Sequence, residues 1–186
     1  MKRNYTILDP LLTPKGKRQC RELRDAFNHH NIVDLVVASP LRRTIQTAAL
    51  SFGPTLAREN VNFLALPVAQ EVSNAPADTG LEPEELKTSL ISLFNGDQLE
   101  FDVHQKLDLC NVEEGWTSKV GNMPTGAVYI SLIQESPDWF LCLHKAGIGE
   151  SCSQFSYLAV STARGTSKSM QYLFYTFGNA RLNRYR

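Results

Sequence analysis

The fold is decided by Ile32-Val-Asp-Leu-Val-Val-Ala38 and by the segment that follows it directly, Ser39-Pro-Leu-Arg-Arg-Thr-Ile-Gln-Thr-Ala48. The first segment is a short apolar run, which is typical of a buried strand. Ser39 and Pro40 end this strand, and residues of helical character then continue to the breakers Gly53-Pro54. Open α/β sheets form their ligand crevices at strand-to-helix junctions of this kind.

Two adjacent arginines, Arg42 and Arg43, stand at this junction. The start of a helix offers free backbone N–H groups and the positive end of the helix dipole, and both favour anions. Guanidinium groups add charge-assisted donors that match the oxygens of phosphate. The junction therefore predicts an oxyanion site, and phosphate is the ligand that suits it best.

Composition and charge limit the class of protein. The 186 residues are enough for one domain with a core, and 19 Lys and Arg balance 19 Asp and Glu. A net charge of zero argues against nucleic acid or an anionic membrane as the main partner. No apolar run approaches the roughly 20 residues of a membrane span, and the first residues show no signal-peptide core. Cytoplasm is therefore the compartment expected by default.

The four cysteines are scattered along the chain at positions 20, 110, 142 and 152. None of them forms a Cys-x-x-Cys pair, so the spacing does not predict a zinc site. We expect free thiols in a reducing compartment and no bound metal.

Helices alternate with apolar strands along the chain, which favours an α/β sheet in one domain covering residues 1–186. Thr13 is a capping residue and Pro14 suits the first position of a helix, so a helix is expected from there to Asn28. Residues 101–121 are polar and irregular, and 125–133 fit a helix or a strand equally well. The remaining expected elements are strands at 32–38, 63–67, 139–143 and 172–177 and helices at 42–50 and 82–94.

Three segments in a fixed order resemble the histidine phosphatase superfamily, also called phosphoglycerate mutase-like. Asp9–Cys20 is similar to the family's D-x-x-L-T-x-x-G-x-x-Q helix entry, Val36–Ala48 to its S-P-x-x-R-x-x-x-T motif, and Leu66–Gly80 to its segment with the acid/base carboxylate. The likeness is greatest to fungal phosphatase-type members and covers residues 5–120, whereas 150–186 show no family pattern. The resemblance implies a three-layer sandwich in which helices flank a mostly parallel sheet.

The resemblance also implies a chemistry. In the family a histidine attacks phosphorus and forms a phosphohistidine, arginines and a second histidine hold the phosphoryl oxygens, and a carboxylate protonates the leaving oxygen. By this resemblance Arg43 binds phosphate, Glu71 is the general acid/base and His144 is the second histidine. No metal or cofactor is implied, and the partner is a small phosphorylated substrate or free phosphate. The structural alternatives are a surface helix arginine, a loop carboxylate and a strand-end histidine with a satisfied hydrogen bond.

The chain departs from the family pattern at two positions. The family's nucleophile lies in an R-H-G or R-H-A motif a few residues before the segment that resembles Asn4–Pro10, and no Arg-His pair is present there. The nucleophile and the first central strand are therefore expected to be missing. His144 stands in Leu141-Cys-Leu-His-Lys-Ala-Gly147 rather than in the family's T/S-H-G-G motif. Three alternatives follow: a phosphatase acting through a phosphohistidine, an inactive truncated remnant that at most binds an anion or a protein partner, and an incomplete gene model.

Other polar and aromatic residues are expected to have structural roles. Asp78 precedes Thr79-Gly80, where its side chain would bond to the backbone of a turn. His29 and His30 would close the first helix, where imidazolium suits the dipole. Arg42 and His104 are expected in solvent, and Trp116 and Trp139 in the core.

Overall fold

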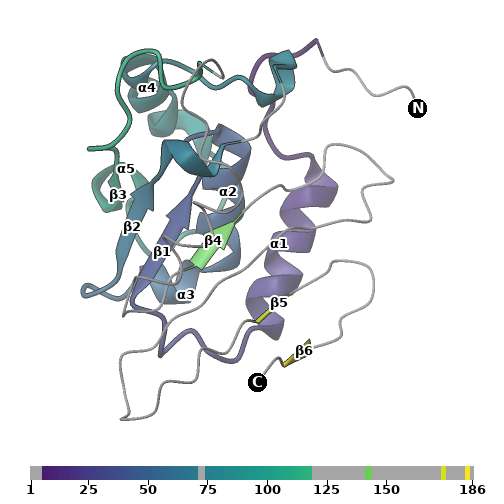
Figure 1. Cartoon of the computed structure of the whole chain (residues 1–186). Coiled ribbons are helices and arrows are strands. Elements are labelled where there is room, and N and C mark those ends of the chain that lie inside the picture. The colour runs from purple at the N-terminus through teal and green to yellow at the C-terminus, as the bar shows by residue number, and fades with distance from the viewer. Residues whose placement is uncertain (1–5, 71–73, 119–140, 144–172, 175–182, 185–186) are drawn as a thin grey trace.

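The computed structural model of the chain describes residues 6–70, 74–118, 141–143, 173–174 and 183–184. Its centre is a four-stranded parallel sheet with the strand order β3-β2-β1-β4 (Figure 1). The strands are β1 (Leu35–Ala38), β2 (Asn62–Ala65), β3 (Leu107–Asp108) and β4 (Leu141–Leu143). All three pairings are parallel, so the carboxyl ends of these strands lie at one edge of the sheet.

β1 is an inner strand and carries the junction that the sequence singles out. Val36, Val37 and Ala38 are buried, as expected for an apolar strand with a neighbour on each side. Ala38 pairs with Ala65 in β2 and with Leu143 in β4. The strand predicted at 32–38 is confirmed with a later start, because residues 28–32 form turns.

α1 (Pro14–Ala26) begins as the sequence predicts. The Thr13 hydroxyl oxygen accepts a hydrogen bond from the Gly16 N–H at 3.1 Å, and Pro14 occupies the first turn. The helix ends at Ala26, so the predicted end at Asn28 is wrong, although His30 Nε2 does bond to the Arg24 carbonyl in the last turn at 2.9 Å. Both histidines follow the helix in a turn.

α2 (Arg42–Ser51) is the central helix, and α1, β1 and α4 (Pro83–Leu93) all pack against it. Every residue from Arg43 to Ser51 is buried. Gln46 accepts a hydrogen bond from the Leu12 N–H at 2.8 Å and donates one to the Leu93 carbonyl at 3.2 Å. This buried amide therefore joins the segment before α1 to the end of α4 and satisfies two backbone groups at once.

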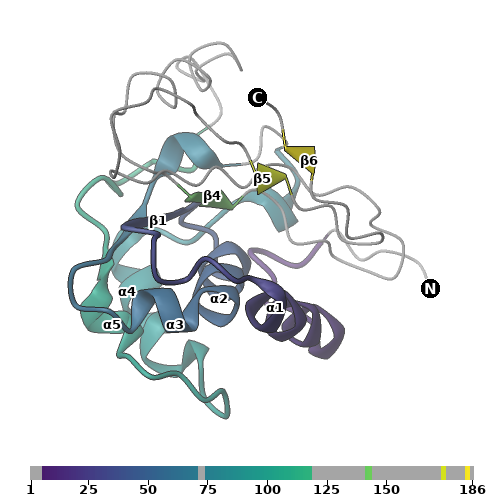
Figure 2. The same ribbon diagram turned by 90° about the horizontal axis from the view of Figure 1, so that it is seen from below.

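The remaining described elements are short. They are α3 (Gly53–Leu56), α5 (Val103–Lys106), β5 (Leu173–Phe174), β6 (Asn183–Arg184) and the 3-10 turns η1 (Pro67–Ala69) and η2 (Pro76–Asp78). Figure 2 shows α1 to α5 together on one face of the sheet. The predicted α/β class, a parallel sheet with helices packed along it, is confirmed, and the described residues form two of the three expected layers.

Trp116 is buried in the main core, as predicted. Its indole N–H donates to the Leu81 carbonyl at 2.9 Å, and its own carbonyl accepts from the Gln70 amide at 2.8 Å. His104 is exposed, also as predicted, although it lies in α5 rather than in a loop. Trp139 and the ambiguous segment 125–133 lie outside the described residues.

Three further findings apply to the described part of the chain. Its helices include none with the length and apolar character needed to cross a bilayer. No three His, Cys, Asp or Glu side chains within these residues are grouped so that they could hold a metal ion. Cys20 is a buried free thiol and Cys110 an exposed one.

Candidate functional site

Of the three residues that the sequence assigns to a site, Arg43 is the one that the structure describes. Glu71 and His144 lie outside the described residues. Leu143, the residue before His144 in the sequence, pairs with Ala38 at the end of β1. The described part of the candidate site therefore lies at the edge of the sheet where β1 and β4 end.

Arg43 is a buried cation in the first turn of α2. It is only 1% exposed, so the alternative of a surface helix arginine is wrong. Its Nη2 donates to Asp78 Oδ1 at 2.8 Å, and its Nη1 donates to the Ala77 carbonyl. Its buried Nε–H has no hydrogen-bond partner among the described residues.

Asp78 lies in η2, 35 residues from its partner Arg43. The prediction that its side chain bonds to the backbone of a turn is therefore wrong, because a carboxylate oxygen of Asp78 contacts the guanidinium instead. The turn itself is present, closed by a hydrogen bond from the Asp78 N–H to the Ala75 carbonyl at 2.8 Å. The charge of the buried arginine is thus compensated within the molecule.

Arg42 is not a solvated neighbour, because it is bound to Asp9. The Arg42 backbone N–H lies 3.1 and 3.2 Å from the two carboxylate oxygens of Asp9, and Arg42 Nε donates to Oδ2 at 3.2 Å. The Asp9 carbonyl accepts a further bond from Arg42 Nη2 at 2.6 Å. Asp9 therefore caps α2 from a distant part of the chain, where the local N-cap residue, Leu41, has no side chain that could do so.

Asp9 itself is completely buried and has a left-handed backbone conformation with φ of 39°. Burial raises the pKa of Asp9 to about 6, although the Arg42 hydrogen bonds and the charges of Arg42 and Arg43 act in the opposite direction. Asp9 is the first residue of the segment that resembles the family's D-x-x-L-T-x-x-G-x-x-Q motif. No local sequence pattern, however, indicates that its carboxylate contacts Arg42.

Ser39, which follows β1, has a buried hydroxyl group for which the described part of the chain supplies no hydrogen-bond partner. The Ser39 carbonyl, in contrast, accepts from the Thr44 hydroxyl at 2.6 Å. Ser39 Oγ and Arg43 Nε are thus two unused buried polar atoms contributed by the same ten-residue motif. Buried polar atoms without partners are uncommon and call for an explanation such as a missing ligand or water.

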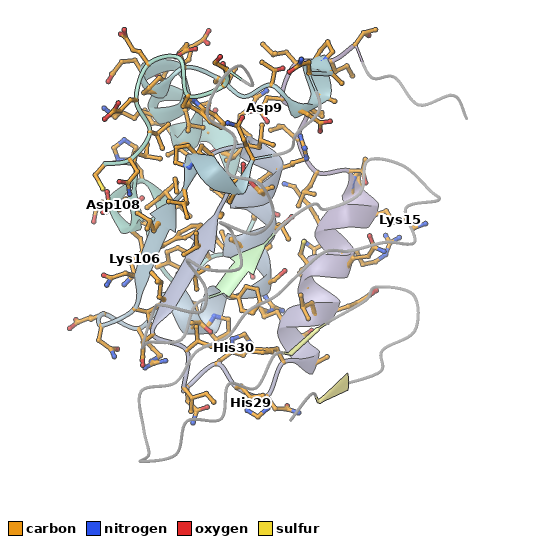
Figure 3. All side chains as sticks on the ribbon, in the orientation of Figure 1. Asp9, Lys15, His29, His30, Lys106 and Asp108 are labelled. Atoms are coloured by element: carbon orange, nitrogen blue, oxygen red, sulfur yellow. The ribbon has the colours of Figure 1, made fainter. Side chains whose placement is uncertain are left out.

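Two of the three histidines in the described residues, His29 and His30, lie away from this edge of the sheet. Figure 3 shows Asp9 at one end of the molecule and His29 and His30 at the opposite end. Both ring nitrogens of His30 are occupied, by the Thr55 hydroxyl at 2.7 Å and the Arg24 carbonyl at 2.9 Å. Neither histidine is therefore placed to act on a group bound at Arg43.

Taken together, these observations define a class of protein: an α/β domain with a buried arginine at the carboxyl end of a parallel strand. An arginine in this position supplies charge and directed donors for an oxyanion. Residues 2–63 match the family model for the histidine phosphatase superfamily (branch 1). This match spans Asp9, β1 and Arg43 and supports the superfamily for this third of the chain. No curated protein and no solved structure matches the chain.

Proposed function

We propose that Arg43 binds the phosphoryl group of a small phosphorylated molecule, and that the chain hydrolyses phosphate monoesters as histidine phosphatases do. The observation that carries the proposal is the buried Arg43 guanidinium with an unused Nε–H at the carboxyl end of β1. Burying a guanidinium is costly, and an apolar side chain would fill the same space more cheaply. Binding of an anionic ligand would explain why a positively charged side chain is buried at this position.

The roles of the other two residues follow from the resemblance. Glu71 is proposed as the acid that protonates the leaving oxygen and then helps to activate water. His144, which follows β4 in the sequence, is the candidate nucleophile: it would attack phosphorus as the ester oxygen leaves, and water would then hydrolyse the phosphohistidine. Arg43 would stabilise the charge on the phosphoryl oxygens in the transition state. Hydrolysis is preferred over phosphoryl transfer between substrate oxygens on the resemblance alone.

Turnover of an aryl phosphate such as p-nitrophenyl phosphate tests this function. We expect Arg43→Ala to lower kcat/KM by about 100-fold or more, since it removes a transition-state charge contact. Arg58→Ala is the matched control, because Arg58 is a half-buried arginine that, like Arg43, bonds to a carbonyl and a carboxylate, but elsewhere in the fold. Hydrolysis that is equal in wild type and Arg43→Ala, with both folded by circular dichroism, would overturn the proposal.

A second candidate is a protein that binds an anion, or a protein partner, without turnover. The observation that favours it is that both arginines of the junction already carry internal carboxylates, while His29 and His30 lie at the other end of the molecule. Mixing the protein with substrate and searching for a phosphorylated histidine by ³¹P NMR separates the two candidates. A phosphohistidine would exclude the non-catalytic candidate, whereas saturable phosphate binding with no phosphohistidine and no turnover would favour it.

A further inference from the structure

We propose that Asp78 is an internal counter-ion that occupies the guanidinium of Arg43 and competes with an incoming phosphate group. The inference rests on the proposed function, because it takes Arg43 as the anion ligand. It adds that the affinity of the site is regulated by a carboxylate of the chain itself, so that phosphate binds tightly only when the Asp78 side chain has turned away.

The contacts of the guanidinium support this view. Both terminal nitrogens of Arg43 are bonded to neighbouring residues of η2, Nη1 to the Ala77 carbonyl and Nη2 to the Asp78 carboxylate. A planar guanidinium binds an oxyanion best through two parallel N–H bonds, and every such pair includes at least one terminal nitrogen. On the Nε side of the guanidinium this terminal nitrogen is Nη2, which already donates to Asp78. An anion that binds Nε–H and Nη2 together must therefore share Nη2 with Asp78 or displace the Asp78 carboxylate.

The two partners differ in their freedom to move. The Arg43 side chain is 2% exposed and is enclosed by the core, whereas the Asp78 side chain is 17% exposed and reaches the surface. Asp78 is thus the partner that can rotate into water. It would exchange one ionic contact for hydration, while Arg43 stays in position.

The backbone of η2 does not depend on this ion pair. The Asp78 N–H donates to the Ala75 carbonyl at 2.8 Å and the Thr79 N–H to the Pro76 carbonyl at 3.2 Å. The Pro76 carbonyl also accepts from the Asp9 N–H at 3.2 Å, which fixes the turn to the start of the chain. The Asp78 carboxylate can therefore leave without displacing the turn, and the Ala77 carbonyl can continue to hold Nη1.

Charge compensation explains why the departure of the Asp78 carboxylate would strengthen phosphate binding. The Arg42 guanidinium is paired with Asp9 and the Arg43 guanidinium with Asp78, so an incoming anion meets both cations of the junction with their charge already compensated. Removing the Asp78 charge leaves one uncompensated buried cation, and Coulomb attraction is strong where water is excluded. An anion then gains the full charge-assisted contact.

The test is a titration of the protein with inorganic phosphate. Calorimetry measures the Kd, and NMR of ¹⁵N-labelled protein monitors the arginine Nε–Hε signals during the same titration. We expect Asp78→Asn to bind phosphate about tenfold more tightly than wild type or better, since a hydrogen bond to a charged group is worth roughly a factor of ten in affinity. The Arg43 Nε–Hε signal should move at the same phosphate concentrations. Asp34→Asn is the matched control, because it removes one carboxylate from the half-buried pair with Arg58 and should leave the Kd unchanged.

The phosphate titration distinguishes the counter-ion role of Asp78 from the phosphate-binding role of Arg43. If wild type and Asp78→Asn bind phosphate with equal Kd values, and Arg43→Lys weakens phosphate binding in both, the counter-ion role of Asp78 is overturned. Arg43 then remains the phosphate ligand. No phosphate-dependent shift of the Arg43 signal in any variant would overturn both. If Asp78→Asn does not fold, Asp78→Ser, which also removes the charge and keeps a small polar group in the turn, takes its place with the same expected tightening.

Discussion

At the scale of single residues, Asp9 shows how a distant side chain completes a helix that its own sequence leaves uncapped. Its carboxylate accepts the Arg42 N–H at 3.1 Å, which satisfies a donor that every α-helix leaves free at its start. Asp9 adopts the left-handed conformation that Asp tolerates better than most residues, and it is fully buried. Desolvation outweighs its favourable contacts, so its carboxyl group has a pKa of about 6.

The raised pKa of Asp9 predicts how stability depends on pH. The folded state binds the Asp9 proton more tightly than the unfolded state, whose pKa is near 3.8. The contribution of Asp9 to the free energy of unfolding is therefore fully present below pH 3.8 and is lost as the pH rises through about 6. By linkage this change amounts to about 3 kcal/mol, from about two pKa units at 1.36 kcal/mol each.

Urea unfolding of wild type and Asp9→Asn between pH 4.5 and pH 7.5 isolates this contribution. Wild type should gain stability relative to Asp9→Asn as the pH is lowered, because only wild type can take up the proton. A difference in free energy that does not change with pH, or that changes in the opposite direction, would contradict the prediction. The second result would mean that the ion pair with Arg42 outweighs the cost of burial.

At the scale of elements, His30 fixes the end of α1 to α3. The Arg24 carbonyl can only accept, so Nε2 of His30 carries the proton and donates to it, and Nδ1 accepts from the Thr55 hydroxyl. The ring also packs edge-on against Phe27 and Phe52. Burial lowers the pKa of His30 below its ordinary value of 6.5, so the neutral ring is the form that the fold uses.

His30 therefore predicts a pH dependence with the opposite sign to that of Asp9. The unfolded state takes up the His30 proton first, so the contribution of His30 is present above about pH 6.5 and is lost as the pH falls below that value. Wild type should lose stability relative to His30→Asn when the pH is lowered from 7.5 to 5.5, as measured by urea unfolding. A difference for His30→Asn that does not change with pH would contradict the role assigned to the neutral ring.

At the scale of the whole molecule, the segment that carries Asp78 is held between distant parts of the chain. At its start the Pro76 carbonyl accepts from the Asp9 N–H, and at its end Gly80 lies against Trp116. A side chain at position 80 would meet the indole ring, whose Cη2 lies 2.6 Å from the place a Cβ would take. Because Trp116 is itself bonded to Leu81 and Gln70, the ring has little room to move.

Gly80→Ala is accordingly expected to destabilise the protein by about 1–3 kcal/mol, through overpacking against Trp116. Gly53→Ala is the matched control, because within the described part of the chain, leaving aside its two neighbours and its own helix, no atom lies within 4 Å of the added methyl group. We expect that variant to lose clearly less stability than Gly80→Ala, because it adds no overpacking and only the restriction on a residue before proline acts against it. Urea unfolding of both variants measures this difference, and equal stabilities would show that the indole ring moves aside.

Local signals in the sequence predicted much of the framework. Thr13 and Pro14 fix the start of α1 because the cap and its partner, the Gly16 N–H, are three residues apart. Trp116 was predicted in the core because few positions other than a core suit so large a ring. The end of α1 was predicted too late, since no strong breaker stands at Ala26 and the turn there depends on contacts of His30 with Thr55.

The sequence by itself determined the order of the main strands and helices, the α/β class and the position of Arg43 at a strand-to-helix junction, because each depends on residues that are close together in the chain. Only the tertiary structure decided the charges that surround the junction. Asp9 and Asp78 reach Arg42 and Arg43 from 33 and 35 residues away. No local pattern encodes such pairings, since burial and electrostatic compensation are properties of the packed domain.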